Sequence, residues 1–285
     1  MKEKSLILIL FLFANCLFAQ TTFTNEYIFD KSSINPAATA LSANSFSLYY
    51  NTKLVGINDA PKTQKIAIQS FVSENTALGF SIYNQEKGVT GKTAFQFKYA
   101  YQLKLNEKLK LSLGLQSEVQ SVYFDESALV LANPEDDAIT GEFHRDMVPE
   151  ASSGLVLYTN KMNFGFSVAN LFGNEIYSRK VGKESIPLAY ISYLDYKLSV
   201  NSFEFTPSVV VLQAADYPLI TQINLNIKYN KFMFGGAVSN SKSVSVISGL
   251  QSGKMIFNYI YSTPSALNTK MAKGGNEIRV QFLLP

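Results

Sequence analysis

Three motifs in this sequence contain residue types that could do chemistry. His144 is the single histidine, so any Ser-His-Asp arrangement would depend on it, and no Gly-x-Ser-x-Gly motif is present. We therefore interpret His144 as a solvated loop residue. Gly91-Lys92-Thr93 imitates the end of a phosphate-binding loop, but Glu86 occupies the position of that motif's first glycine. The sequence thus predicts neither an enzyme nor a bound cofactor.

The third motif is an acidic cluster, whose oxygen atoms are of the kind that Ca²⁺ prefers. Its members are Glu135, Asp136, Asp137, Glu142, Asp146 and Glu150. Their spacing differs from that of a calcium-binding loop, so we interpret the cluster as a solvated surface loop and predict no metal site.

The first residues have the composition of an export signal. Lys2 and Lys4 precede an apolar run over residues 6–13, and Ala19 offers a small residue for cleavage. We expect residues 1–19 to be a signal peptide and residues 20–285 to form one domain. The only cysteine, Cys16, lies within this signal, so the mature chain should have no disulfide. Lipid attachment at Cys16 is the alternative, which Asn15 disfavours because a small residue is expected there.

The remaining charge is close to balance. Removal of Lys2, Glu3 and Lys4 reduces the 25 basic and 22 acidic residues to 23 and 21, a net charge of +2. So small a net charge does not favour binding to nucleic acid.

Apolar and polar residues alternate strictly along much of the chain, which is typical of β-strands with two different faces. The clearest case is a hairpin over residues 93–120, in which Phe95, Phe97 and Tyr99 alternate with polar residues and leucines follow after the turn. Each leg is about 9 to 11 residues long, enough to cross a bilayer at a tilt. About fourteen such strands are predicted, over residues 45–51, 64–72, 78–83, 93–103, 109–120, 154–158, 162–169, 188–198, 203–212, 222–229, 232–239, 244–251, 255–261 and 277–282.

Short and long connections alternate between these strands, which is typical of membrane barrels. Long connections are expected at residues 55–63, 85–92, 121–152, 171–187, 213–220 and 262–275, whereas 240–242 is short where a long one is due. We predict an all-β fold, a closed antiparallel transmembrane β-barrel in the outer membrane, with the N-terminus in the periplasm and long loops on the cell surface. A soluble β-sandwich of a secreted adhesin is an alternative, because alternation alone cannot distinguish lipid from a core.

The polar faces of these strands should line the barrel lumen. The residues concerned are Gln96, Lys98, Gln116, Glu118, Asn224, Asn226, Lys228, Glu277 and Arg279. Because their charges are mixed in sign, we interpret them as hydrogen-bonding partners inside a filled barrel rather than as a selectivity filter.

Several motifs occur in a characteristic order. Residues 25–29 read Asn-Glu-Tyr-Ile-Phe, residues 34–37 read Ile-Asn-Pro-Ala, and residues 56–63 read Gly-Ile-Asn-Asp-Ala-Pro-Lys-Thr. With Leu78-Gly79-Phe80 and residues 164–167, this order resembles the PorP/SprF family of Bacteroidetes outer-membrane proteins. Departures are Ala38-Thr39-Ala40 in place of the usual Tyr-Ala-Gly, and a chain end after Phe282 without a terminal aromatic residue.

The resemblance implies a component of the type IX protein secretion and gliding machinery. Such a protein would support export or surface attachment of proteins with a C-terminal sorting domain, and its partners would be lipid, periplasmic ring proteins and those secreted proteins. A channel or transporter for small solutes is the alternative. Candidate partner-binding residues are Asn35, Pro36, Gly56, Pro61 and Lys62. Pro36 should hold Asn35 extended and lead rigidly into the first strand, as a simple turn or as a periplasmic docking element, and residues 56–63 would be a connector or a binding loop.

Overall fold

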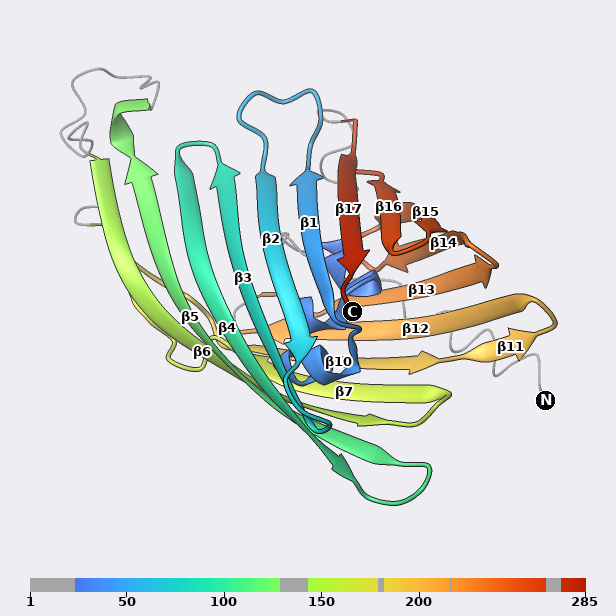
Figure 1. Cartoon of the computed structure of the whole chain (residues 1–285). Coiled ribbons are helices and arrows are strands. Elements are labelled where there is room, and N and C mark those ends of the chain that lie inside the picture. Colours follow the sequence, from blue (N-terminus) through green and yellow to red (C-terminus); the bar gives the residue numbers. More distant parts are fainter. Residues whose placement is uncertain (1–23, 129–142, 179–181, 216, 265–272) are drawn as a thin grey trace, which may run out of the picture.

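The fold is a closed antiparallel β-barrel, seen in a computed structural model that describes residues 24–128, 143–178, 182–215, 217–264 and 273–285 (Figure 1). Within these residues, fourteen strands pair in chain order. The first strand pairs with the last, and β10 pairs with β12 across the remaining gap. Closure leaves no free sheet edge along the membrane, where unpaired backbone groups would be costly. The predicted fold class and number of strands are confirmed.

The barrel strands differ in length. They are β1 (Ser45–Thr52), β2 (Lys62–Phe71), β3 (Thr76–Lys87), β4 (Thr90–Lys104), β5 (Lys110–Asp125), β6 (Phe143–Tyr158), β7 (Met162–Ala169), β10 (Ala189–Tyr196), β12 (Phe203–Ala214), β13 (Ile220–Tyr229), β14 (Phe232–Ser239), β15 (Val244–Ser252), β16 (Met255–Ser262) and β17 (Gly275–Leu283). Outside the ring, β8 (Glu175–Ser178) and β9 (Gly182–Ser185) form a separate hairpin. The short β11 (Leu198–Val200) pairs with the start of β12, and η4 (Glu126–Ala128) is one 3₁₀ turn.

The two faces of the wall are as the alternation predicts. Phe97 and Leu113 are 48% and 45% exposed on the outer face, whereas Lys98 and Glu118 are 5% and 9% exposed on the inner one. An apolar outside and a polar inside are the reverse of a soluble β-protein and are typical of a barrel in lipid. In the described part of the chain, no helix has the length and apolar character needed to cross a membrane.

Of the predicted long connections, one is wrong and another has narrower bounds. Residues 85–92 form a tight turn, because β3 continues to Lys87 and β4 begins at Thr90. The connection predicted at residues 121–152 is shorter than expected, since β5 continues to Asp125 and β6 begins at Phe143. His144 is therefore a strand residue rather than a loop residue. These strand ends lack apolar alternation because a strand that extends beyond the lipid meets water on both faces.

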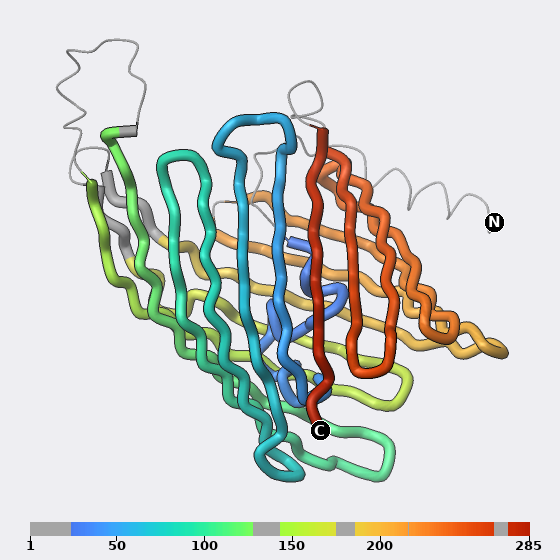
Figure 2. Tube along the Cα trace, turned by 45° about the horizontal axis from the view of Figure 1, so that its top comes forward, coloured from blue at the N-terminus to red at the C-terminus, as the bar shows by residue number. Residues whose placement is uncertain are grey.

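Residues 24–41 lie inside the barrel and contain three 3₁₀ helices, η1 (Asn25–Ile28), η2 (Lys31–Ser33) and η3 (Pro36–Leu41). Figures 1 and 2 show this dark blue segment enclosed by the wall. We call it the plug. The predicted lead from Pro36 directly into the first strand is thus wrong, since a helix follows Pro36 and the strand begins only at Ser45.

Candidate functional site

The candidate site is the lumen together with its plug. Two polar side chains start the plug's helices by accepting hydrogen bonds from free backbone N–H groups. Asp30 accepts from Ser32 N at the start of η2, and Asn35 Oδ1 accepts from Ala37 N at 3.0 Å at the start of η3. Pro36 occupies the first position of η3, where its missing N–H costs nothing. As predicted, Asn35 is extended, with φ −149° and ψ 113°.

Three ion pairs join the plug to the wall. They are Lys65 with Glu26 at 2.8 Å, Lys31 with Asp195 at 3.0 Å, and Arg279 with Asp30 at 3.6 Å. Five of the six side chains are less than a tenth exposed, and Lys31 is 19% exposed. Removing one partner of a buried pair leaves the other charge uncompensated, so these pairs fix the position of the plug.

Wall side chains also satisfy the plug's backbone carbonyl groups, which short irregular helices leave free. Lys98 Nζ donates to Ser32 O at 2.6 Å, and Ser112 Oγ donates to Ala37 O at 2.8 Å. Ser167 and Gln102 of the wall donate in the same way to Ile34 O and Ala40 O. In the opposite direction, the side-chain amide of Asn35 in the plug donates to Leu155 O and Phe166 O of the wall. Wall side chains therefore hydrogen-bond to the plug from η2 to the end of η3.

A row of small residues on the inner wall makes room for η3. The row follows the pairing of β3 to β7 and consists of Ala77, Ala100, Gly114, Gly154 and Ser167. A Cβ atom on Gly114 would lie 2.1 Å from Ala37 N, and one on Gly154 would lie 2.1 Å from Asn35 Oδ1. Glycine is thus required at both positions because the plug contacts the wall there directly.

Beside the plug, the predicted lumen residues form a network around Glu118. Its carboxylate accepts hydrogen bonds from Tyr83 Oη at 2.9 Å, Gln96 Nε2 at 2.7 Å and Gln116 Nε2 at 3.1 Å. The network borders a polar cavity of about 170 Å³ that also reaches Lys92. The contacts of Gln96 and Tyr83 with Glu118 join strands, as predicted for Gln96 and Glu118, whereas the contact of Gln116 with Glu118 lies within β5.

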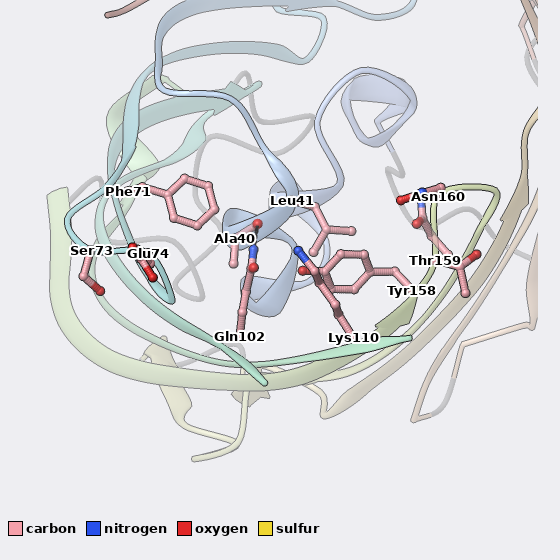
Figure 3. Close-up of a pocket in the computed structure, with 11 residues that line it drawn as sticks. Ala40, Leu41, Phe71, Ser73, Glu74, Gln102, Lys110, Tyr158, Thr159 and Asn160 are labelled. Atoms are coloured by element: carbon pink, nitrogen blue, oxygen red, sulfur yellow. Dashed lines mark hydrogen bonds between the residues drawn. The ribbon is translucent and has the colours of Figure 1, made fainter. Parts of the chain in front are cut away.

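At the end of the barrel with the short turns, an open bowl of about 560 Å³ lies below the plug (Figure 3). Ala40 and Leu41 of η3 form its floor. Its sides are residues of two turns and of nearby strand ends, among them Phe71, Glu74, Gln102, Lys110, Tyr158 and Asn160. Glu74 and Asn160 are exposed. The mixed polar and apolar lining suits contact with protein.

The structure separates the predicted partner-binding residues into two places. Asn35 and Pro36 are buried in the lumen and bind the protein's own wall. Gly56, Pro61 and Lys62 lie in or beside the connection from β1 to β2, at the end with the long loops. Gly56 has φ +98°, a conformation that glycine adopts readily. The two motifs therefore do not form one site.

The acidic and histidine motifs have local structural contacts. His144 Nε2 lies 3.2 Å from Glu126 Oε1. Glu150 is buried and accepts hydrogen bonds from the backbone N–H groups of Phe172 and Asn174. Glu135, Asp136, Asp137 and Glu142 lie outside the described residues, and the described acidic and histidine side chains form no metal-binding group.

Sequence reasoning missed the charged contacts of the plug. Glu26, Asp30 and Lys31 were not predicted to contact the wall. Three charges within six residues of an otherwise uncharged stretch could have indicated that this segment has charged partners. Lys65 is next to Ile66, which is exposed on the outer face. Because neighbouring side chains of a strand point to opposite faces, Lys65 must point into the lumen.

Fold and site together define the class of protein: a membrane β-barrel with polar lumen walls and an internal plug. The chain belongs to the PorP/SprF family of type IX secretion system membrane proteins, whose model matches residues 17–282. The family predicted from the sequence motifs is confirmed.

Solved structures of membrane barrels share this fold. A FadL homologue of Pseudomonas aeruginosa has a TM-score of 0.51 at 10% identity, with 89% of this chain and 94% of that one covered. The toluene transporter TodX of Pseudomonas putida has a TM-score of 0.51 at 9% identity, with 93% and 94% covered. At such identities the likeness shows the fold alone. No curated protein matches the sequence.

Proposed function

We propose that this protein is an outer-membrane component of the type IX secretion machinery that acts through its surfaces rather than through a pore. It supports export or surface attachment of proteins that have a C-terminal sorting domain. The observation that carries this proposal is the lumen, which is occupied by the chain's own residues 24–41 and held by three ion pairs. A conducting barrel would need that space for its solute.

The same proposal gives the barrel an orientation. Short turns face the periplasm and longer connections face the cell surface, as in other membrane barrels. The bowl beside Glu74 and Asn160 then opens to the periplasm, where ring proteins of the machinery would contact it. Gly56, Pro61 and Lys62 lie on the cell-surface side, where exported proteins arrive.

A deletion strain tests the proposal. Surface and culture-medium proteins with the C-terminal sorting domain should be lost, and should return when the wild-type chain is supplied from a plasmid. Purified protein in planar bilayers should give no steady conductance. An unchanged surface proteome together with a steady open pore would refute the secretion role and favour a channel for small solutes.

A further inference from the structure

The plug has a direction through the lumen, and its first residues lie at the end with the long loops. Asn25 Nδ2 donates to Ser262 Oγ at 3.1 Å, and Ser262 is the last residue of β16 before a long connection. Gln222 Nε2, close to the same end of β13, donates to Asn25 Oδ1 at 2.7 Å. Glu277, near the start of β17, accepts from the backbone N–H of Asn25. The Asn25 amide also donates to Glu277 at 2.9 Å and to Ser245, near the start of β15, so contacts with four strands fix η1 at this end.

The last residues of the plug lie at the opposite end. Ala40 O accepts a hydrogen bond from Gln102, close to the end of β4 that precedes a short turn. Ser112, which binds Ala37 O, lies equally close to the start of β5. The plug thus passes through the lumen from the long-loop end to the short-turn end, and β1 then returns through the wall.

This path changes the side on which the described chain begins. An even number of strands returns a chain to the side from which its first strand started. Here the plug adds one further crossing, so Thr24 and the C-terminus lie at opposite ends. Leu284 N donates to Asn44 O, which places the C-terminus beside the start of β1 at the short-turn end. With the orientation proposed above, Thr24 lies on the cell-surface side, which differs from the expectation of an N-terminus in the periplasm.

We propose that Thr24 is presented on the cell surface, on the same side as the long loops, while the C-terminus lies in the periplasm. This proposal rests on the orientation given under the proposed function. Thr24, which is partly exposed, then belongs to the outer face, where exported surface proteins are the available partners, whereas Asn25, Glu26 and Tyr27 behind it are buried. No contact from the periplasm could reach Thr24, because the ion-paired plug lies between.

Cysteine labelling of intact cells tests this topology. The only native cysteine is Cys16, which the expected signal cleavage removes, so the parent protein provides the background. Three variants are compared with a membrane-impermeant charged maleimide: Thr24→Cys, Asn58→Cys in the long connection after β1, and Glu107→Cys in a short turn. Asn58 is exposed, and the Glu107 side chain is 89% exposed, so both controls are open to the reagent.

We expect Thr24→Cys to be labelled on intact cells to an extent similar to Asn58→Cys, and Glu107→Cys only after permeabilisation. Labelling of Thr24→Cys only after permeabilisation, with Asn58→Cys labelled on intact cells, would overturn the proposal and leave the orientation intact. Labelling of Glu107→Cys rather than Asn58→Cys on intact cells would overturn the orientation, and the surface position of Thr24 with it. If Thr24→Cys is not labelled on intact or on permeabilised cells, an epitope inserted directly before Thr24 shows on which side of the membrane this residue lies. Antibody binding to intact cells supports the proposal, and binding only after permeabilisation overturns it.

Discussion

Gly114→Ala should weaken the attachment of the plug, because the plug backbone lies directly against the wall at Gly114. The added methyl group would lie 2.1 Å from Ala37 N, 2.4 Å from Ala37 Cα and 2.5 Å from Pro36 C. Ordinary van der Waals contact begins at 3.4 Å, so the plug must retreat from the wall. All three atoms belong to the backbone and cannot rotate away as the tip of a side chain could.

The cost has two parts. Overpacking of a tight contact destabilises by about 1 to 3 kcal/mol. A retreat of the plug also stretches the hydrogen bonds of Ser112 to Ala37 O and of Asn35 to Leu155 O, each of which contributes about 1 kcal/mol. If both hydrogen bonds are lost, the free energy of unfolding should therefore fall by about 3 to 5 kcal/mol.

Urea unfolding of the barrel in lipid vesicles measures this change. The matched control is Gly236→Ala in β14, where the nearest atom to the new methyl group is Ser245 O at 3.5 Å. A loosened plug should also make Gly114→Ala conduct intermittently in planar bilayers, whereas Gly236→Ala should not. Equal unfolding curves and equal conductance for the two variants would refute the contact between wall and plug.

Three further predictions concern the lipid face, an ion pair and the bowl. Leu113→Arg should lower the free energy of unfolding in vesicles by about 2 to 4 kcal/mol if this side chain lies at mid-bilayer, and easy tolerance would place that face elsewhere. Lys65→Met should cost about 3 to 5 kcal/mol by leaving Glu26 unpaired in the lumen; the double variant with Glu26→Leu should recover much of this in the same urea assay, and equal losses would contradict the pairing. Glu74→Ala combined with Asn160→Ala should reduce surface proteins with the sorting domain at unchanged barrel levels on immunoblots. Glu107→Ala, on a neighbouring turn, should not, and equal effects would argue against the bowl as a contact surface.

The wall could be predicted from the sequence because the two faces of each strand meet different environments. Lipid outside and polar groups inside impose an alternation that local sequence records, as in Phe95, Gln96, Phe97 and Lys98. This is why the strand count and the faces of β4 and β5 are correct. Beyond the lipid, around Gln85 and Phe124, the alternation fades and the predicted strands end too early.

The plug could not be predicted in the same way. Its 3₁₀ helices are three to six residues long, which is too short for a periodic pattern. Pro36 correctly indicates an extended Asn35, but the same signal suits a turn, a docking motif or the start of a short helix. In the sequence, Gly114 and Gly154 look like ordinary residues of the polar face. Their role, to leave room for the plug, depends on a segment that is distant in the sequence.

The closing strand of the barrel contacts the plug, and this bears on how the protein assembles. Glu277 and Arg279 of β17 bind Asn25 and Asp30, and the contact of Glu277 with Asn25 spans 252 residues. Contacts so distant in the chain form late and slowly, because the intervening chain must first be ordered. Pairing of β17 with β1 therefore also brings Glu277 and Arg279 to their partners in the plug. A chain whose plug is not yet inside would close with Lys65, Asp195 and Arg279 of the wall lacking their ion-pair partners, so barrel closure favours the form with the plug inside.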